Sequence, residues 1–161
     1  MTDPRAPSPA LETIQTKLAN GALDEAGILI DELLVDFASD PNLAYLNALR
    51  YRLSGNAAKA LQTLSDLTAR FPDMARAHQE VAVNCLSINL PQKALEAAET
   101  AVALDGSLLA CWELLAPLQQ RFAPEKQEIT EQQIAFLKSL PQALRTVMSY
   151  LSQNQLNDAE R

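Results

Sequence analysis

The sequence predicts an all-α protein built from repeated pairs of helices. Three observations support this prediction. Residues of the same kind recur every 34 positions, apolar residues follow the spacing of a helix, and no segment alternates in the manner of a β-strand. The chain has 161 residues, of which 48% are hydrophobic, so it can bury a core as one domain or one run of repeats.

The repeat is clearest in two series of alanines. Their members are 34 positions apart: Ala26, Ala60 and Ala94 in one series, and Ala48, Ala82 and Ala116 in the other. The same step relates three residues that can adopt a left-handed backbone, which are Gly21, Gly55 and Asn89. It also relates Pro72 to Gly106. A period of this length indicates an array of helical repeats.

The helices are expected in the following order. Asn20-Gly21 separates two helical patterns in the acidic region 1–40, whose carboxylates are expected on a solvated helix face. Helices then follow over 43–53 and 61–71, separated by Ser54-Gly55-Asn56. The next pair is expected over 74–88 and 91–104, with Pro91 in a first turn.

The pattern becomes irregular after residue 116. Pro117 is expected to interrupt a helix. Two more helices are expected after Pro124 and Pro141, and each has a predicted buried face: Ile129, Gln133, Phe136, Leu137 and Leu140 in one, Leu144, Val147, Met148 and Leu151 in the other. Residues 151–159 resemble 18–26, which predicts a turn at Asn154. We therefore expect the chain to be the N-terminal piece of a longer polypeptide.

These features resemble the tetratricopeptide repeat (TPR) family, a helix–turn–helix repeat of 34 residues. The matching residues are Trp112-x2-Leu115-Ala116, Ala48-x2-Tyr51 and Ala60-x3-Leu64 followed by Pro72, with looser copies at Ala26-x3-Ile30 and Ala94-x3-Ala98. Gln119 stands where the family has tyrosine. The resemblance implies a right-handed α-solenoid of antiparallel helix pairs. The alanines would lie where helices approach closely, whereas Ala57 would lie at an exposed helix start.

The expected organisation is a flexible tail over residues 1–8 and one TPR-like array over 9–161. The repeats span about 9–40, 41–73, 74–106 and an irregular 107–140, and 141–161 starts a truncated further repeat. Residues 136–144 running into 156–160 also resemble the middle of bacterial TPR-containing sulfotransferases. That resemblance implies an alternative function, an accessory domain for substrate docking or oligomerisation in an enzyme whose catalytic part lies beyond residue 161.

The composition of the chain disfavours nucleic-acid binding, catalysis and metal binding by these residues. The net charge of −7 disfavours nucleic acid as a partner. Cys85 and Cys111 have apolar neighbours and are expected to be buried, and His78 shares its repeat position with Trp112, so it is expected to be a packing residue. We expect no catalytic residues, no metal site and no cofactor. No signal peptide or spanning segment is evident, so a cytoplasmic location and no membrane partner are expected.

A binding scaffold is the favoured function. Family geometry places a partner-binding groove along the first helix of each pair. The groove positions are Leu11, Gln15, Leu18, Asn42, Tyr45, Leu49, Arg52, Arg76, Gln79, Val83, Leu86, Ala110 and Glu113. The expected partner is a protein or peptide segment, acidic or of mixed polarity, paired with Arg52 and Arg76.

Two further expectations concern partners. The lysines and asparagines with which chaperone-binding TPR proteins clamp a C-terminal carboxylate are mostly missing, because Leu11, Gln15 and Leu46 stand in their place. Chaperone-tail binding is therefore not expected. Self-association through the uncapped C-terminal end is a further hypothesis.

Overall fold

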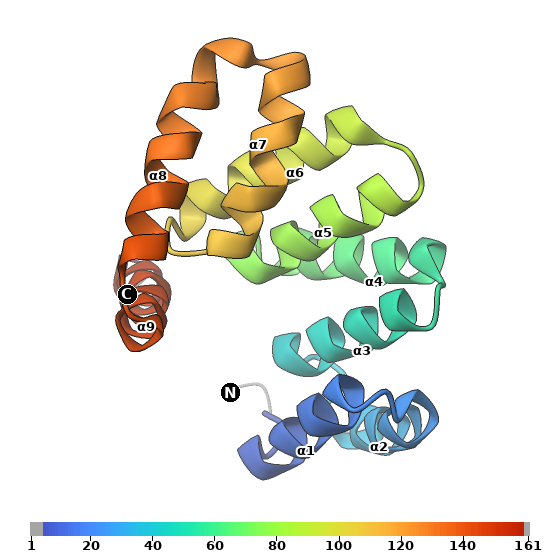
Figure 1. Cartoon of the computed structure of the whole chain (residues 1–161). Helices are drawn as coiled ribbons and strands as arrows, with labels where there is room; N and C mark the ends of the chain where they lie inside the picture. The colour runs from blue at the N-terminus through green and yellow to red at the C-terminus, as the bar shows by residue number, and fades with distance from the viewer. Residues whose placement is uncertain (1–4, 160–161) are drawn as a thin grey trace. The chain divides into compact units, whose positions relative to one another are not determined.

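The computed structural model describes the backbone of residues 5–159 and the side chains of residues 5–152 (Figure 1). This part of the chain contains nine α-helices, one short 3-10 helix and no β-strand. The elements are α1 (Ser8–Ala19), α2 (Leu23–Asp36), α3 (Pro41–Leu53), α4 (Ala57–Arg70), α5 (Ala75–Ser87), α6 (Pro91–Leu104), α7 (Leu109–Phe122), η1 (Pro124–Lys126), α8 (Gln127–Ser139) and α9 (Gln142–Ala159). The predicted all-α fold is confirmed. The helices predicted over 43–53, 61–71, 74–88 and 91–104 correspond to α3 to α6, although α4 begins four residues earlier than predicted.

The helices form two compact units, Met1–Phe71 and Pro72–Arg161. In the first unit α1 packs on α2 and α3, α2 packs on α3, and α3 packs on α4. The core of this unit contains six apolar side chains that are at most 4% exposed: Ile14, Leu18, Ala26, Ile30, Leu43 and Leu46. Every one of the first three helices therefore contributes to one core.

The turns within helix pairs have the backbone that the repeat predicts. Gly21 has φ = 76°, Gly55 has φ = 77° and Asn89 has φ = 60°. These left-handed residues end α1, α3 and α5, and each allows a tight reversal into the second helix of the pair. The 34-residue step thus relates three structurally equivalent turns.

The two alanine series lie mainly in the interior. Ala26, Ala60 and Ala94 in second helices are fully buried, and so are Ala48 and Ala82 in first helices. Their methyl groups leave room for neighbouring backbones. Ala116 is half-buried, in keeping with the irregular fourth repeat. The expectation that Ala57 is exposed is wrong, because Ala57 is half-buried and the exposed residue at the start of α4 is Ala58.

Asp40 is another correction. It was expected among the acidic residues of a solvated face, but its side chain is 1% exposed. Its Oδ1 accepts hydrogen bonds from the backbone N–H groups of Asn42 (2.8 Å) and Leu43 (3.0 Å) and thereby caps α3. Its Oδ2 accepts the N–H of Ala6 (2.9 Å), and Ala6 is itself buried. The predicted tail, residues 1–8, thus ends within the folded structure.

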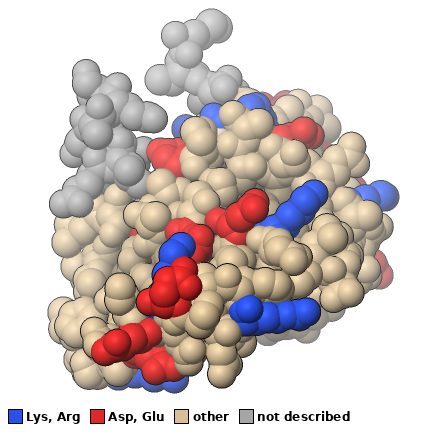
Figure 2. All heavy atoms as spheres, turned by 90° about the horizontal axis from the view of Figure 1, so that it is seen from above, with Lys and Arg blue, Asp and Glu red and all other residues tan. Residues whose placement is uncertain are grey.

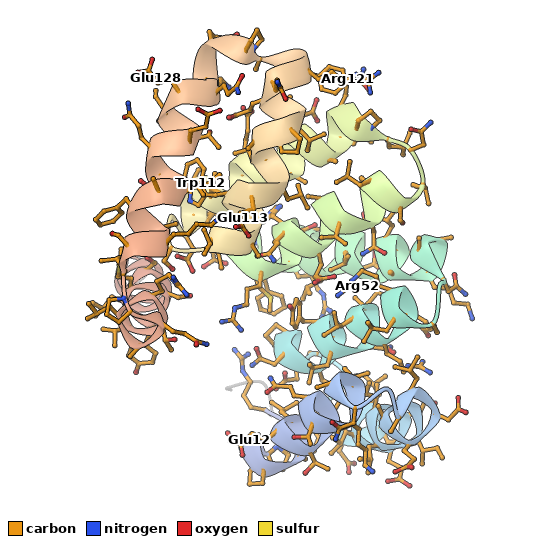
Figure 3. The ribbon with its side chains drawn as sticks, in the orientation of Figure 1. Glu12, Arg52, Trp112, Glu113, Arg121 and Glu128 are labelled. Atoms are coloured by element: carbon orange, nitrogen blue, oxygen red, sulfur yellow. The ribbon has the colours of Figure 1, made fainter. Side chains whose placement is uncertain are left out.

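In the second unit α5 packs on α6, α6 on α7, and α7 on α8. The core is rich in small side chains: Ala82, Ala97, Ala98, Ala101, Val102, Cys111 and Leu115. Trp112 packs against this core from the side of α7 that faces α8 (Figure 3). Its Nε1–H donates to the carbonyl oxygen of Gly106 over 2.9 Å.

His78 repeats the arrangement of Trp112 one period earlier. Its Nε2 lies 2.8 Å from the carbonyl oxygen of Pro72, again six residues upstream. Because a carbonyl oxygen can only accept, Nε2 carries the hydrogen in this bond. His78 is half-buried, so its prediction as a packing residue is confirmed. In both repeats a ring N–H thus donates a hydrogen bond to a backbone carbonyl oxygen of the loop before its helix.

The expected interruption at Pro117 is wrong. Helix α7 runs without a break from Leu109 to Phe122 with Pro117 inside it. A proline removes the hydrogen bond to the carbonyl four residues earlier, which here belongs to Glu113. Both residues are exposed. Water can therefore hydrogen-bond to that carbonyl oxygen. The free-energy cost of the missing backbone hydrogen bond is thus smaller than it would be in the interior, and the helix continues through Pro117.

The predicted face of α8 is only partly right. Leu137 is buried and Gln133 is half-buried, but Ile129 is 67% exposed and Phe136 is 50% exposed. The helix instead buries Thr130, whose hydroxyl donates to the buried amide oxygen of Gln119. The residue that stands in place of the tyrosine of the TPR pattern, Gln119, is thus the partner of the buried Thr130.

The last helix differs most from expectation. Of the predicted buried face, Leu144, Val147 and Leu151 are each about half exposed, and Met148 alone is half-buried. The backbone of α9 also continues to Ala159 without the turn expected at Asn154. The local resemblance to residues 18–26 did not suffice to form a turn, because the sequence at 154 has no glycine and glutamine and leucine favour helix.

Candidate binding surface

The predicted groove residues on α3 share one side of that helix. Asn42, Tyr45, Leu49 and Arg52 follow at intervals of three, four and three residues. Asn42 is exposed and the other three are half-buried. Tyr45 and Leu49 pack against the core of the first unit, so their outer surfaces alone remain accessible. The side is therefore a mixed one, with an apolar centre and polar ends.

The predicted residues on α5 occupy equivalent positions one period later. Arg76, Gln79, Val83 and Leu86 follow with the same intervals. Arg76 is exposed, Gln79 and Val83 are half-buried, and Leu86 is 39% exposed. The apolar centre recurs at Val83, which corresponds to Leu49. The first three of these four positions have the same exposure on both helices, whereas Arg52 is half-buried and its equivalent Leu86 is exposed.

The predictions on α7 and α1 have mixed outcomes. Ala110 and Glu113 on α7 are exposed, and a carboxylate oxygen of Glu113 lies 2.8 Å from Nζ of Lys138 on α8 (Figure 3). On α1, Gln15 is exposed and Leu11 packs against the core. Leu18 is 4% exposed and belongs to the core, so its assignment to the groove is wrong.

On the face that Figure 2 shows, acidic and basic side chains are interspersed among uncharged ones. Among the candidate residues, the first unit has one cation, Arg52 on α3 (Figure 3), and the second unit has one cation, Arg76 on α5, and one acid, Glu113 on α7. Arg52 and Tyr45 already have interaction partners within the chain. Arg76 is therefore the cation that contributes most directly to an exposed surface.

The thiols and the titratable groups were inspected for reactive chemistry. Burial raises the pKa of the Cys111 thiol to about 12 and its Sγ points at the carbonyl oxygen of Ala98, 3.6 Å away. Burial also raises the pKa of Cys85, although Lys93 opposes this. Both thiols are thus buried and protonated near neutral pH, as their prediction as small core residues requires.

Among the described residues, no group of three or more histidine, cysteine, aspartate or glutamate side chains is placed to hold a metal ion. No helix in this part of the chain is both long enough and apolar enough to cross a membrane.

Comparison with known proteins defines the fold. No protein-family model and no curated protein matches the chain. Among solved structures the chain is similar to residues 41 to the end of MamA from Desulfovibrio magneticus RS-1, a TPR-containing protein. The match has 18% sequence identity and a TM-score of 0.64, and it covers 84% of this chain and 75% of that chain.

The chain has a TPR-like fold. In this fold α3, α5 and α7 are first helices of pairs, and α2, α4 and α6 are second helices. The regular spacing of the alanines and of the left-handed turns is thus explained by equivalent positions in successive TPR-like pairs.

Three polar residues of structural importance were missed by sequence reasoning. Asp105 is 1% exposed, and its Oδ1 accepts from the N–H (3.0 Å) and the hydroxyl (2.6 Å) of Ser107. Its Oδ2 accepts from the hydroxyl of Ser149 on α9 at 2.6 Å. One sequence signal could have identified Asp105. Like Asp40, it lies in a loop between two helix pairs, shortly before the next helix begins, where an aspartate often accepts backbone N–H groups.

A second missed group joins α6 to α8. Glu99 on α6 accepts from Nζ of Lys126 at 2.7 Å and from the amide of Gln119 at 3.5 Å. Glu99 holds the pKa of Lys126 above its usual value. Gln119 in turn accepts from Thr130. No sequence motif announces such a chain of contacts, because its members come from four different elements.

Proposed function

We propose that this chain is a non-catalytic scaffold that binds a protein or peptide segment along the first helices of its TPR-like pairs. The observation that supports the proposal most is the equivalence of α3 and α5. Each presents a half-buried apolar residue, Leu49 or Val83, at the same repeat position, and each begins with an exposed polar residue, Asn42 or Arg76. The fold itself is one that commonly binds protein partners.

The proposed groove consists of Asn42, Tyr45, Leu49, Arg52, Arg76, Gln79, Val83, Leu86 and Glu113. An extended or helical peptide with apolar anchors would contact Leu49 and Val83. Acidic groups on the peptide would pair with Arg76 and with the outer part of Arg52. Such charges at a rim mainly accelerate association and select the partner, while the apolar anchors determine how long it stays bound.

The proposal can be tested with a displayed library of random 12-residue peptides selected on the intact chain. Recovered peptides should carry acidic and apolar residues. Their binding should weaken at least tenfold for Val83→Glu and for the double variant Arg52→Glu/Arg76→Glu. Arg76→Glu alone should also weaken binding, and Lys93→Glu is its matched control, because it makes the same charge change at an exposed position on the second helix α6. Equal losses for Arg76→Glu and Lys93→Glu would refute the assignment of the groove.

Two broader expectations remain predictions. We propose that residues 9–161 form one continuous array, and that the chain acts in the cytoplasm. An accessory role in a sulfotransferase or other enzyme is the alternative function. The gene sequence downstream of the codon for Arg161 would distinguish that alternative from a free-standing scaffold.

A further inference from the structure

Helix α9 is attached to its unit by polar contacts. Along the part of α9 with described side chains, the shielded residues are Arg145, Met148, Ser149 and Ser152. This spacing of three, one and three marks one side of a helix. Ser149 donates its hydroxyl hydrogen bond to Asp105, and Nη1 of Arg145 donates to the carbonyl oxygens of Leu137 (2.9 Å) and Leu140 (3.2 Å).

The opposite side of α9 is apolar and exposed. Leu144 is 51% exposed, Val147 52%, Tyr150 64% and Leu151 52%. Single exposed apolar residues are ordinary on protein surfaces. Four of them within eight residues of one helix form a contiguous patch, which on a protein in water marks an interaction site. We call these four residues the α9 patch.

Charge indicates which partner the α9 patch suits. Between Gln142 and Asn157 the sequence has a single charged residue, Arg145, whose guanidinium is engaged by the carbonyls of Leu137 and Leu140. A charged partner would therefore find nothing on the patch with which to pair. The whole chain has a net charge of −7, so two copies repel each other at most approaches. An uncharged surface is where two copies can meet with the least repulsion.

The order of residues also favours a second copy. In a two-fold interface residue i of one copy meets residue j of the other, and j meets i. Leu144 and Leu151 lie at equal distances in sequence from a centre between Val147 and Met148. Met148 is half-buried, and on the helix it borders Leu144 and Leu151, so it lies at the edge between the shielded side and the α9 patch. Antiparallel packing about this centre places Leu144 of one copy against Leu151 of the other.

We propose that two copies of this chain associate through their α9 helices, packed antiparallel about a two-fold axis between Val147 and Met148. The contact is independent of the groove proposed above, since it uses a different helix. One pair of helices buries less surface than the ~1,200–2,000 Å² of a typical stable interface. The dimer is therefore weak, and it forms and dissociates with concentration.

Sedimentation velocity over a range of concentrations tests this proposal, with Val147→Glu and a matched control, Val35→Glu. Val35 is also a valine on a helix and is 82% exposed on α2. The unsubstituted chain and Val35→Glu should both shift from monomer to dimer as concentration rises into the millimolar range. Val147→Glu should remain monomeric. A chain that stays monomeric throughout, or a dimer that survives Val147→Glu, would overturn the proposal.

A cysteine substitution tests the geometry without adding a charge. Cys85 and Cys111 are buried, so the thiol that an oxidant reaches in the Val147→Cys variant is the one at position 147. Two such cysteines near the two-fold axis should form a disulfide dimer under mild oxidation, at a rate at least tenfold above that of Val35→Cys. Equal rates for the two variants would contradict the proposed axis. Arg76→Glu should leave the dimer unchanged, which separates failure of this proposal from failure of the groove.

Discussion

Substitution of Ala60 by phenylalanine tests the central feature of the fold, the alanine at the closest approach of paired helices. Ala60 is 0% exposed in α4. Overfilling a packed interior costs about 1–3 kcal/mol, and phenylalanine is a poorer helix former than alanine by about 0.5 kcal/mol. At about 2–4 °C for each kcal/mol in a chain of this size, Ala60→Phe should lower the Tm by about 3–14 °C.

Ala58→Phe is the control, because Ala58 is exposed and lies in the same helix. It carries the propensity cost alone, so its Tm should fall by about 1–2 °C. Both variants can be followed by thermal melts in far-ultraviolet circular dichroism at equal protein concentration. The difference between the two variants isolates the packing cost. If the two melting temperatures fall by the same amount, the alanine series does not mark close helix approaches and the argument from the repeat is wrong.

Three further predictions concern other parts of the chain. Ser149→Ala removes a hydrogen bond to the buried Asp105 carboxylate, so amide hydrogen exchange in α9 should accelerate while exchange in α5 and α6 stays unchanged. Gly55→Ala should destabilise by about 1–2 kcal/mol in urea unfolding because φ is 77°, whereas Gly106→Ala, which has no left-handed backbone, should cost less. Burial raises the pKa of the Cys111 thiol to about 12 in the folded chain, from its ordinary value of 9.0. The stability that this thiol contributes is therefore complete below pH 9.0 and is lost as the pH rises from there towards 12. Chemical unfolding over this pH range should show a smaller loss of stability for Cys111→Ala than for the unsubstituted chain.

The regular part of the fold could be predicted because several independent signals agree there. At Gly55 the glycine, the repeat step and the apolar spacing on both sides all indicate the same turn, and the structure has it with φ = 77°. At Ala60 the repeat position and the helical spacing both indicate burial, and the residue is fully buried. Sequence patterns are most informative where small or left-handed residues are required, since few alternatives fit.

The irregular part could not be predicted because the sequence signals there conflict. The apolar spacing on α8 pointed to Ile129 and Phe136, but the helix is rotated so that Thr130 meets Gln119 instead. Binary patterning assumes that apolar residues face the core, whereas a buried polar pair with good geometry can set a different register. Such a pair is formed by two residues from different helices, and nothing local in either helix announces it.

The exposure of the candidate residues was predictable only in part. The periodic spacing placed Asn42 on α3 and Arg76 on α5, and both side chains are exposed. It could not show that Leu18 belongs to the core, because burial depends on which helices cover α1. Nor could it show that Arg52 already has a partner within the chain. The partners of a long flexible side chain depend on tertiary neighbours.

The buried aspartates explain how an apolar helix face can remain exposed. The carboxylate of Asp40 accepts a hydrogen bond from the backbone N–H of Ala6, and the carboxylate of Asp105 accepts one from the hydroxyl of Ser149 on α9. Hydrogen bonds to an ionised carboxylate are stronger than those between neutral groups. Because the hydroxyl of Ser149 and the guanidinium of Arg145 hold α9, its attachment to its own unit does not depend on Leu144 or Leu151, which are each about half exposed. The same polar anchoring that made the predicted core face of α9 wrong therefore leaves the α9 patch available to a second copy.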